Sequence, residues 1–142
     1  MDKHTGSSVA VVERLLSGRD PMQPDLDLPV VDVADVSACH IAALDSPEAI
    51  NKRYICAESF ANFRDLAAAL QANFPDRKIS QRLAPKFVLK LLALFDAQIA
   101  LILPMIGKKM HLSHAAATED LGVTFTPADE AVIRTARFLA AK

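Results

Sequence analysis

Only four glycines occur in the chain, and their positions limit which ligand-binding loops it can form. They are Gly6, Gly18, Gly107 and Gly122, which stand 12, 89 and 15 residues apart. The two common loops that cradle a phosphate need two or more glycines within about six residues, because the backbone must approach the ligand closely. The sequence therefore predicts no nucleotide-binding loop of either kind.

Composition and charge are those of an ordinary globular domain. The 142 residues are 51% hydrophobic and 23% charged, which excludes intrinsic disorder. Sixteen basic and 17 acidic side chains leave a formal charge of −1, which gives no basic surface for nucleic acid or an anionic membrane. Two cysteines form no disulfide framework, and residues 1–10 are too polar for a signal peptide. We therefore expect a cytoplasmic protein that binds neither nucleic acid nor membrane.

Hydrophobic spacing predicts helices that alternate with a few short strands. The helices have apolar residues three and four apart, whereas the strands are short apolar or β-favouring runs. Asn62 is the expected N-terminal cap of the third helix. In the first part of the chain the expected elements are helices at 7–17, 34–45 and 63–74, and strands at 28–33, 53–57 and 78–83.

The most apolar stretch, 87–106, is better interpreted as two helices than as a membrane span. Asp96 lies near its middle, where insertion into a membrane would cost about 2.5–3.5 kcal/mol. We expect a break just before Asp96, with this residue capping the second helix. Thr126 and Pro127 then predict a final helix at 128–141, because both residue types favour a helix start.

The number of strands limits the fold class. Two or three short strands are too few for a parallel sheet covered by helices on both faces. We expect an α/β fold that is mostly helical with a few short strands. The chain is either a part of a larger α/β unit or a small, mostly helical domain.

Histidines and cysteines give no strong catalytic or metal-binding pattern. His111 and His114 could share a helix face as metal ligands, but no cysteine or carboxylate lies nearby before Glu119. Exposed polar residues are the simpler interpretation. Cys39 and His40 are adjacent on a predicted helix, so their side chains diverge and form no nucleophile pair. We predict no metal site and no catalytic residue.

Other reactive side chains have simpler structural roles. Cys39 and Cys56 lie in apolar runs, where buried and unreactive thiols are expected. Asp32 and Asp35 flank the start of the helix expected at 34–45, so capping is a simpler role for them than catalysis. The residues alone therefore indicate no catalytic constellation.

Four segments, in this order and spacing, carry a family resemblance. They are 30–44 (VVDVADVSACHIAAL), 53–56 (RYIC), 103–108 (LPMIGK) and 120–131, which contains DLGVTFTP followed by Glu130 and Ala131. The set resembles the extended short-chain dehydrogenases/reductases, a family of NAD(P)-dependent epimerases, dehydratases and reductases. The apolar stretch before the last segment is similar to the dihydroflavonol reductase-like branch.

The resemblance covers nearly the whole chain but only the C-terminal half of that family. It implies a substrate-binding part of an extended Rossmann-type reductase without the dinucleotide-binding half. Residues 1–142 would act as a single unit, in which 1–45 return to the main sheet and 46–142 form the cap. NAD(P) is implied for a complete member, but the Gly-x-x-Gly-x-x-Gly turn and the Tyr-x-x-x-Lys pair are absent. Four residues after Tyr54 stands Glu58. The chain alone is expected to bind no cofactor and to catalyse nothing.

The resemblance also implies a mainly apolar small-molecule substrate with a carbonyl or hydroxyl group. Nucleotide-sugar members have an arginine where this chain has Leu28, so a diphosphate would lose its bidentate partner. The implied partner is a separate cofactor-binding half or a second copy of the chain. The alternative is a stand-alone ligand-binding or protein-interaction module derived from such a cap. Candidate pocket residues are Leu28, Val30, Phe87, Leu91, Phe95 and Ile106.

Overall fold

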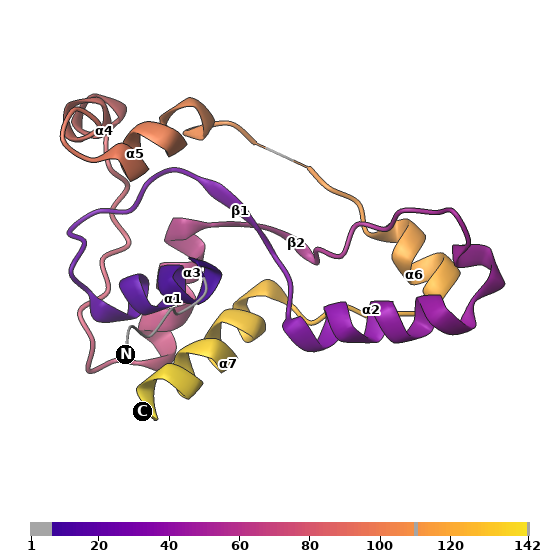
Figure 1. Cartoon of the computed structure of the whole chain (residues 1–142). Helices are drawn as coiled ribbons and strands as arrows, with labels where there is room; N and C mark the ends of the chain where they lie inside the picture. The colour runs from indigo at the N-terminus through magenta and orange to yellow at the C-terminus, as the bar shows by residue number, and fades with distance from the viewer. Residues whose placement is uncertain (1–6, 110, 142) are drawn as a thin grey trace, which may run out of the picture. The chain divides into compact units, whose positions relative to one another are not determined.

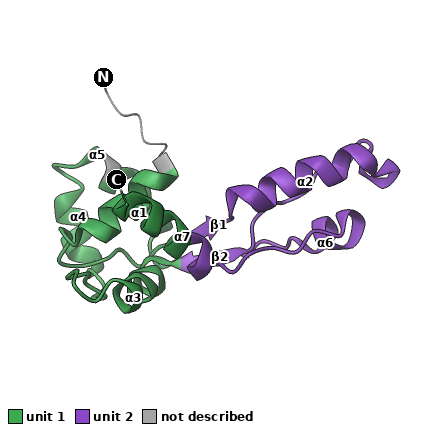
Figure 2. Cartoon of the chain, turned by 90° about the horizontal axis from the view of Figure 1, so that it is seen from below, with its two compact units in different colours: residues 1–27, 62–109, 132–142 green, residues 28–61, 110–131 purple. Residues whose placement is uncertain are grey.

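The computed structural model describes residues 7–109 and 111–141, and Figure 1 shows the order of their elements. The described chain is α/β and mostly helical, with one small two-stranded sheet, as the sequence predicts. It divides into two compact units, which Figure 2 colours separately. Of the described residues, the first unit contains 7–27, 62–109 and 132–141, and the second contains 28–61 and 111–131. The functional division at residue 45 stays a prediction.

Two helices of the first unit pack against each other and confirm the sequence prediction. They are α1 (Ser7–Ser17) and α3 (Phe63–Asn73). Asn62 caps α3 as expected, because its side-chain oxygen accepts a hydrogen bond from the backbone N–H of Arg64 at 3.0 Å. Gly18 ends α1 with a φ of +64°, a conformation that glycine adopts without steric cost. Leucines of both helices supply the buried contacts: Leu15, Leu16, Leu66 and Leu70.

A second apolar cluster of the first unit forms around α4 (Lys86–Leu92) and α5 (Ala97–Ile102). The expected break between the two helices is confirmed. Asp96 precedes α5, and its Oδ1 accepts a hydrogen bond from the N–H of Ile99 at 3.4 Å. No helix in the described ranges is both long and apolar enough to cross a membrane. The cluster contains Met22, Ala84, Leu89, Ile99, Ile102, Leu103 and Ile106.

The expected strand at 78–83 is wrong. In its place the backbone makes an isolated parallel bridge between Gln23 and Leu83. Gln23 donates its N–H to the carbonyl of Arg82 at 2.7 Å and accepts from the N–H of Ala84 at 2.8 Å. The bridge is not extended into a strand, because Pro85 lacks an N–H and α4 begins directly after it.

The two strands of the structure are β1 (Asp27–Val30) and β2 (Ser59–Asn62). At one end the N–H of Glu58 donates to the carbonyl of Val30, and at the other Phe63 donates to Leu26, so the pair is antiparallel. The apolar strand expected at 28–33 is therefore shorter and begins one residue earlier. The strand expected at 53–57 is wrong, because this segment has no strand partner among the described residues.

The core of the second unit lies between α2 (Val33–Asp45) and α6 (Ala115–Leu121). The sequence predicts α2, but it does not predict α6. Asp35 joins α2 to the segment before α7 (Ala128–Ala140), since its carboxylate accepts from the N–H and the hydroxyl of Thr126 at 2.7 and 3.1 Å. Thr126 and Pro127 precede the last helix, as the sequence predicts, and the helix begins at Ala128. The buried members of this core are Cys39, Ala117, Val123 and Phe125.

Candidate functional site

The six candidate pocket residues have different environments. Phe87, Leu91 and Phe95 belong to the α4–α5 region of the first unit, and their side chains are exposed, Phe95 to 86%. Ile106 of the same unit is buried against Leu89 and Ala84, so it supports this region from within. Leu28 and Val30 are half-buried on β1.

The exposed residues of this region form what we call the α4–α5 apolar surface. Phe87 and Leu91 stand one helical turn apart on α4, so their side chains lie on one face. A surface of this kind on a globular protein marks a place for an apolar ligand or a partner. Its members are Phe87, Leu91, Leu92, Leu94, Phe95 and Leu101.

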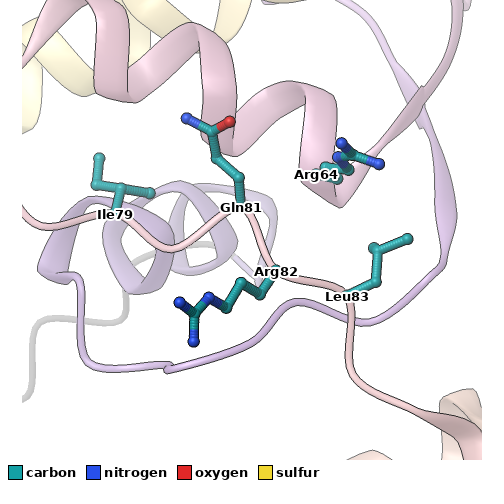
Figure 3. Close-up of a pocket in the computed structure, with 5 residues that line it drawn as sticks. All are labelled: Arg64, Ile79, Gln81, Arg82 and Leu83. Atoms are coloured by element: carbon teal, nitrogen blue, oxygen red, sulfur yellow. The ribbon is translucent and has the colours of Figure 1, made fainter.

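A hollow of about 540 Å³ lies elsewhere in the first unit and is wide open to solvent (Figure 3). None of the six candidates lines it. In Figure 3 the guanidinium groups of Arg64 and Arg82 point in different directions, so they do not converge on one anion. The remaining lining residues are Ile79, Gln81 and Leu83. The hollow therefore offers no constellation of polar groups for catalysis.

A polar cluster around the buried Asp27 of the first unit was not predicted from the sequence. The side-chain amide of Asn62 donates to Asp25 at 3.0 Å and to Asp27 at 2.8 Å. Lys109 also donates to Asp27 at 3.1 Å, and the Asp27 residue is only 7% exposed. The cluster thus ties three distant segments together. Because its carboxylates are already bound to donors, its role is structural.

The histidines do not form the pair that a metal would need. His111 lies outside α6 and is exposed, so the two histidines do not share a helix face. His114 directly precedes α6, where its Nδ1 lies 3.1 Å from the carbonyl oxygen of Ala57 and its ring packs against Phe125. Among residues 7–109 and 111–141, no three His, Cys, Asp or Glu side chains are grouped to hold a metal ion.

Cys39 and Asp32 have the structural roles that the sequence predicts. Cys39 is 3% exposed, and burial, together with a hydrogen bond to Cys56, raises the pKa of its thiol to about 11. Such a thiol is almost entirely protonated at neutral pH and therefore a poor nucleophile. The carboxylate of Asp32 caps α2 by accepting from the N–H of Ala34 at 2.9 Å.

The single tyrosine takes part in a surface network of the second unit. The hydroxyl of Tyr54 donates to Asp120 at 2.9 Å, and Lys52 donates to the same carboxylate oxygen at 2.7 Å. Hydrogen bonds from Lys52 and then from Tyr54 lower the pKa of Asp120. Partial burial and the bond to Asp120 raise the pKa of Tyr54. This network fastens the segment at 52–54 to α6.

The lowered pKa of Asp120 predicts a pH-dependent contribution to stability. A carboxyl group whose pKa falls on folding stabilises the folded chain above its ordinary pKa, and this contribution is lost as pH falls through the lowered value. We expect Asp120→Asn to lower the melting temperature at pH 7 by at most a few degrees, because solvent screens this ion pair at the protein surface.

Thermal melts of the wild type and Asp120→Asn across the acid range test this prediction. The difference between them is expected to disappear below the lowered pKa of Asp120. Asp76→Asn, in the exposed turn after α3, is the matched control. A difference that stays constant or grows in acid would contradict the assignment.

Comparisons with known proteins show the fold. No protein-family model matches the chain, and no curated protein matches it. The crystal structure of gox2253 matches 96% of the chain with a TM-score of 0.74 at 22% identity. The crystal structure of Gre2 from Candida albicans in complex with NADPH matches 97% with a TM-score of 0.62 at 18% identity. The chain spans 44% of gox2253 and 38% of Gre2, which is less than half of each.

Proposed function

We propose that this chain is the substrate-binding part of an NAD(P)-dependent oxidoreductase. Its substrate would be the carbonyl or hydroxyl group of a mainly apolar small molecule. The observation that carries the proposal is the match of nearly the whole chain to less than half of Gre2, a protein whose crystal structure contains NADPH. The four segments that resemble the extended short-chain dehydrogenases/reductases support the same assignment.

The described residues do not fit a dinucleotide, so a second part must supply it. A pyrophosphate binds at a helix N-terminus, where backbone N–H groups point at the ligand. Gly18 and Gly122 instead follow the C-terminal ends of α1 and α6, where carbonyl groups point outward. Tyr54 is bonded to Asp120, and the residue four positions after it is Glu58 and not the lysine that a Tyr-x-x-x-Lys pair would need. On this proposal, the described residues supply neither the glycine-rich loop that holds a dinucleotide nor the acid of a Tyr-x-x-x-Lys pair.

The role left to the chain is to bind the substrate and exclude water. The α4–α5 apolar surface suits this role, because Phe87, Leu91 and Phe95 present a large exposed apolar area. Exclusion of water around a reacting carbonyl favours hydride transfer when a dinucleotide is bound nearby. Ile106 stabilises the surface from within.

A chimera provides the test. The full chain replaces the region of Gre2 that it matches, so that the remainder of Gre2 is expected to bind NADPH. We expect the chimera to oxidise NADPH in the presence of apolar aldehydes or ketones, and not with nucleotide sugars. Phe87→Ser is expected to raise KM for an aromatic carbonyl compound by about 10–100-fold, because it removes an apolar contact.

Phe138→Ser is the matched control, since this phenylalanine is also exposed but lies on α7. It is expected to leave KM unchanged. A chimera that binds NADPH but oxidises it no faster with any carbonyl compound would overturn the proposal. That result would favour the alternative, a stand-alone ligand-binding or protein-interaction module.

A further inference from the structure

The two cysteines of the chain, 17 residues apart in sequence, belong to one apolar cluster of the second unit. Cys39 lies on α2 and is buried, with 3% of its surface exposed. Cys56 is half-buried in the extended segment at 53–57 and packs against the same cluster. Both thiols are free. The fold therefore brings a buried thiol and a more accessible one together from two separate segments.

The extended segment directs Cys56 towards the cluster. Exposure alternates along it, because successive side chains of an extended backbone point to opposite sides: Arg53 and Ile55 are exposed, whereas Tyr54 and Cys56 are half-buried. A hydrogen bond joins the thiols of Cys39 and Cys56. A disulfide needs Cβ atoms about 3.5–4.5 Å apart, a spacing that two thiols in hydrogen-bond contact approach. A covalent bridge therefore requires only a small adjustment of the two side chains.

The surroundings of the pair give the two thiols different roles. Burial, followed by the hydrogen bond to Cys56 and the charge of a Cys56 thiolate, raises the pKa of Cys39 to about 11. Cys39 therefore stays protonated while Cys56 is free. A small oxidant in solution reaches Cys56 first, because that residue is the more accessible of the two. Once Cys56 is bonded to another sulfur it carries no charge, so a Cys39 thiolate is no longer repelled and forms more readily.

We propose that Cys39 and Cys56 form a reversible intramolecular disulfide, which joins α2 to the segment at 53–57 when a low-molecular-weight disulfide such as glutathione disulfide oxidises the chain. The bridge is independent of the proposed function, since both thiols belong to one unit. It also suits its surroundings, because a disulfide carries no charge and the other buried members of the cluster are Ala117, Val123 and Phe125.

The bridge forms by two thiol–disulfide exchanges. First, the Cys56 thiolate attacks one sulfur of glutathione disulfide. A bond forms between Cys56 and that sulfur, the sulfur–sulfur bond of glutathione disulfide breaks, and the first glutathione leaves as a thiolate that takes up the proton lost by Cys56. Cys39 then loses its proton and attacks the sulfur of Cys56, which expels the second glutathione, and this thiolate takes up that proton. Two cysteine thiols are oxidised and one glutathione disulfide is reduced to two thiols, so atoms and electrons balance.

Peptide mapping of the full chain after incubation with glutathione disulfide tests the bridge. Trypsin cuts after Lys52 and Arg53, which lie between the two cysteines, so each cysteine is released in its own peptide. The expected product is peptide 20–52 linked to peptide 54–64, and dithiothreitol is expected to separate them. Glutathione on Cys56 without any linked peptide would overturn the proposal. A link between two chains, seen as a dimer on a non-reducing gel, would also overturn it.

The equilibrium with glutathione shows whether the folded chain favours the bridge. The ratio of oxidised to reduced chain is measured in defined mixtures of glutathione and glutathione disulfide, in buffer and in urea. We expect an equilibrium constant for oxidation at least about tenfold larger in the folded chain, because the fold already holds the thiols together. By linkage, the oxidised chain is expected to melt at least about 3 °C above the reduced chain. Equal constants in buffer and in urea would overturn the proposal.

Two matched variants test the order of the two steps. Cys39→Ala leaves Cys56 without a second thiol, so Cys56 is expected to keep a stable glutathione adduct. Cys56→Ala leaves the buried Cys39 alone, and we expect it to react at least about tenfold more slowly. Equal rates for the two variants would overturn the assignment of Cys56 as the first thiol to react. The peptide map of the wild type decides the bridge itself, even where a variant is unstable.

Discussion

Replacing Asn62 with alanine is expected to lower the free energy of unfolding by about 2–4 kcal/mol. One part of this loss is the N-terminal cap of α3, because the side-chain oxygen bonds the N–H of Arg64. The larger part comes from the amide nitrogen, which donates to both Asp25 and Asp27. Asp27 is only 7% exposed, so water cannot easily replace the donor that its carboxylate loses.

Urea unfolding of three variants checks this account of Asn62. Asn73→Ala is the matched control, since Asn73 lies on the same helix but is exposed, and it is expected to cost less than about 1 kcal/mol. Asn62→Asp keeps an acceptor for the cap but replaces the amide donor by a third carboxylate. It is expected to destabilise the chain at pH 7 at least as much as Asn62→Ala. Stability of Asn62→Asp close to wild type would show that capping alone matters.

Replacing Gly18 with alanine is expected to cost about 3 kcal/mol or more, whereas Gly122→Ala should cost about 1–2 kcal/mol. Both glycines have a left-handed backbone, with φ of +64° and +66°, so the conformational penalty is similar. The surroundings differ. A Cβ at Gly18 would lie 2.6 Å from the backbone oxygen of Lys78, whereas a Cβ at Gly122 would have no atom within 4 Å. The difference between the two variants therefore measures the steric contact.

Calorimetric melts of Gly18→Ala and Gly122→Ala measure the loss of stability that each substitution causes. The close approach at Gly18 fixes the loop at Lys78 against the end of α1, which Arg77 also contacts through the carbonyl of Leu16. Backbone cannot rotate away as a flexible side chain can, so a large loss is expected. Equal losses for Gly18→Ala and Gly122→Ala would show that the segment at Lys78 shifts freely.

The sequence predicts the helices whose signals are local. α1, α2 and α3 follow from apolar spacing, and their ends follow from Gly18, Asp32 and Asn62, which act within three residues of themselves. The break before α5 follows from a single aspartate in an apolar run. These elements could be predicted because their stabilising contacts lie close together in sequence.

Of the two strands, β1 overlaps the apolar run expected at 28–33, whereas β2 could not be predicted, because strand pairing depends on distant partners. Tyr54 and Ile55 favour β structure, but strand formation needs a neighbour, and the described chain offers none at 53–57. β2 forms at Ser59–Asn62, a stretch of weak β propensity, because β1 lies alongside it. Local preference therefore identified an extended segment but not its partner.

In the candidate site, too, contacts between residues far apart in the sequence could not be predicted. The bonds from Asn62 to Asp25 and Asp27 span 37 and 35 residues, and that from Thr126 to Asp35 spans 91. No spacing rule connects such residues. The grouping of Phe87 and Leu91 on one helix face could be predicted, whereas the burial of Ile106 depends on packing against Leu89 and Ala84.

Each compact unit is assembled from separate stretches of chain, since the polypeptide passes between the units four times. During translation, the first unit must therefore wait for its last stretch, which begins at residue 132, although its first stretch ends at residue 27. At about 5–20 residues per second, that interval lasts about 5–20 s. The apolar face of α1 can pack on α3 as soon as that helix is made, but the first unit stays incomplete on the ribosome until its last stretch follows. A premature stop before residue 132 would leave the first unit without its last stretch, even if all the earlier segments were complete.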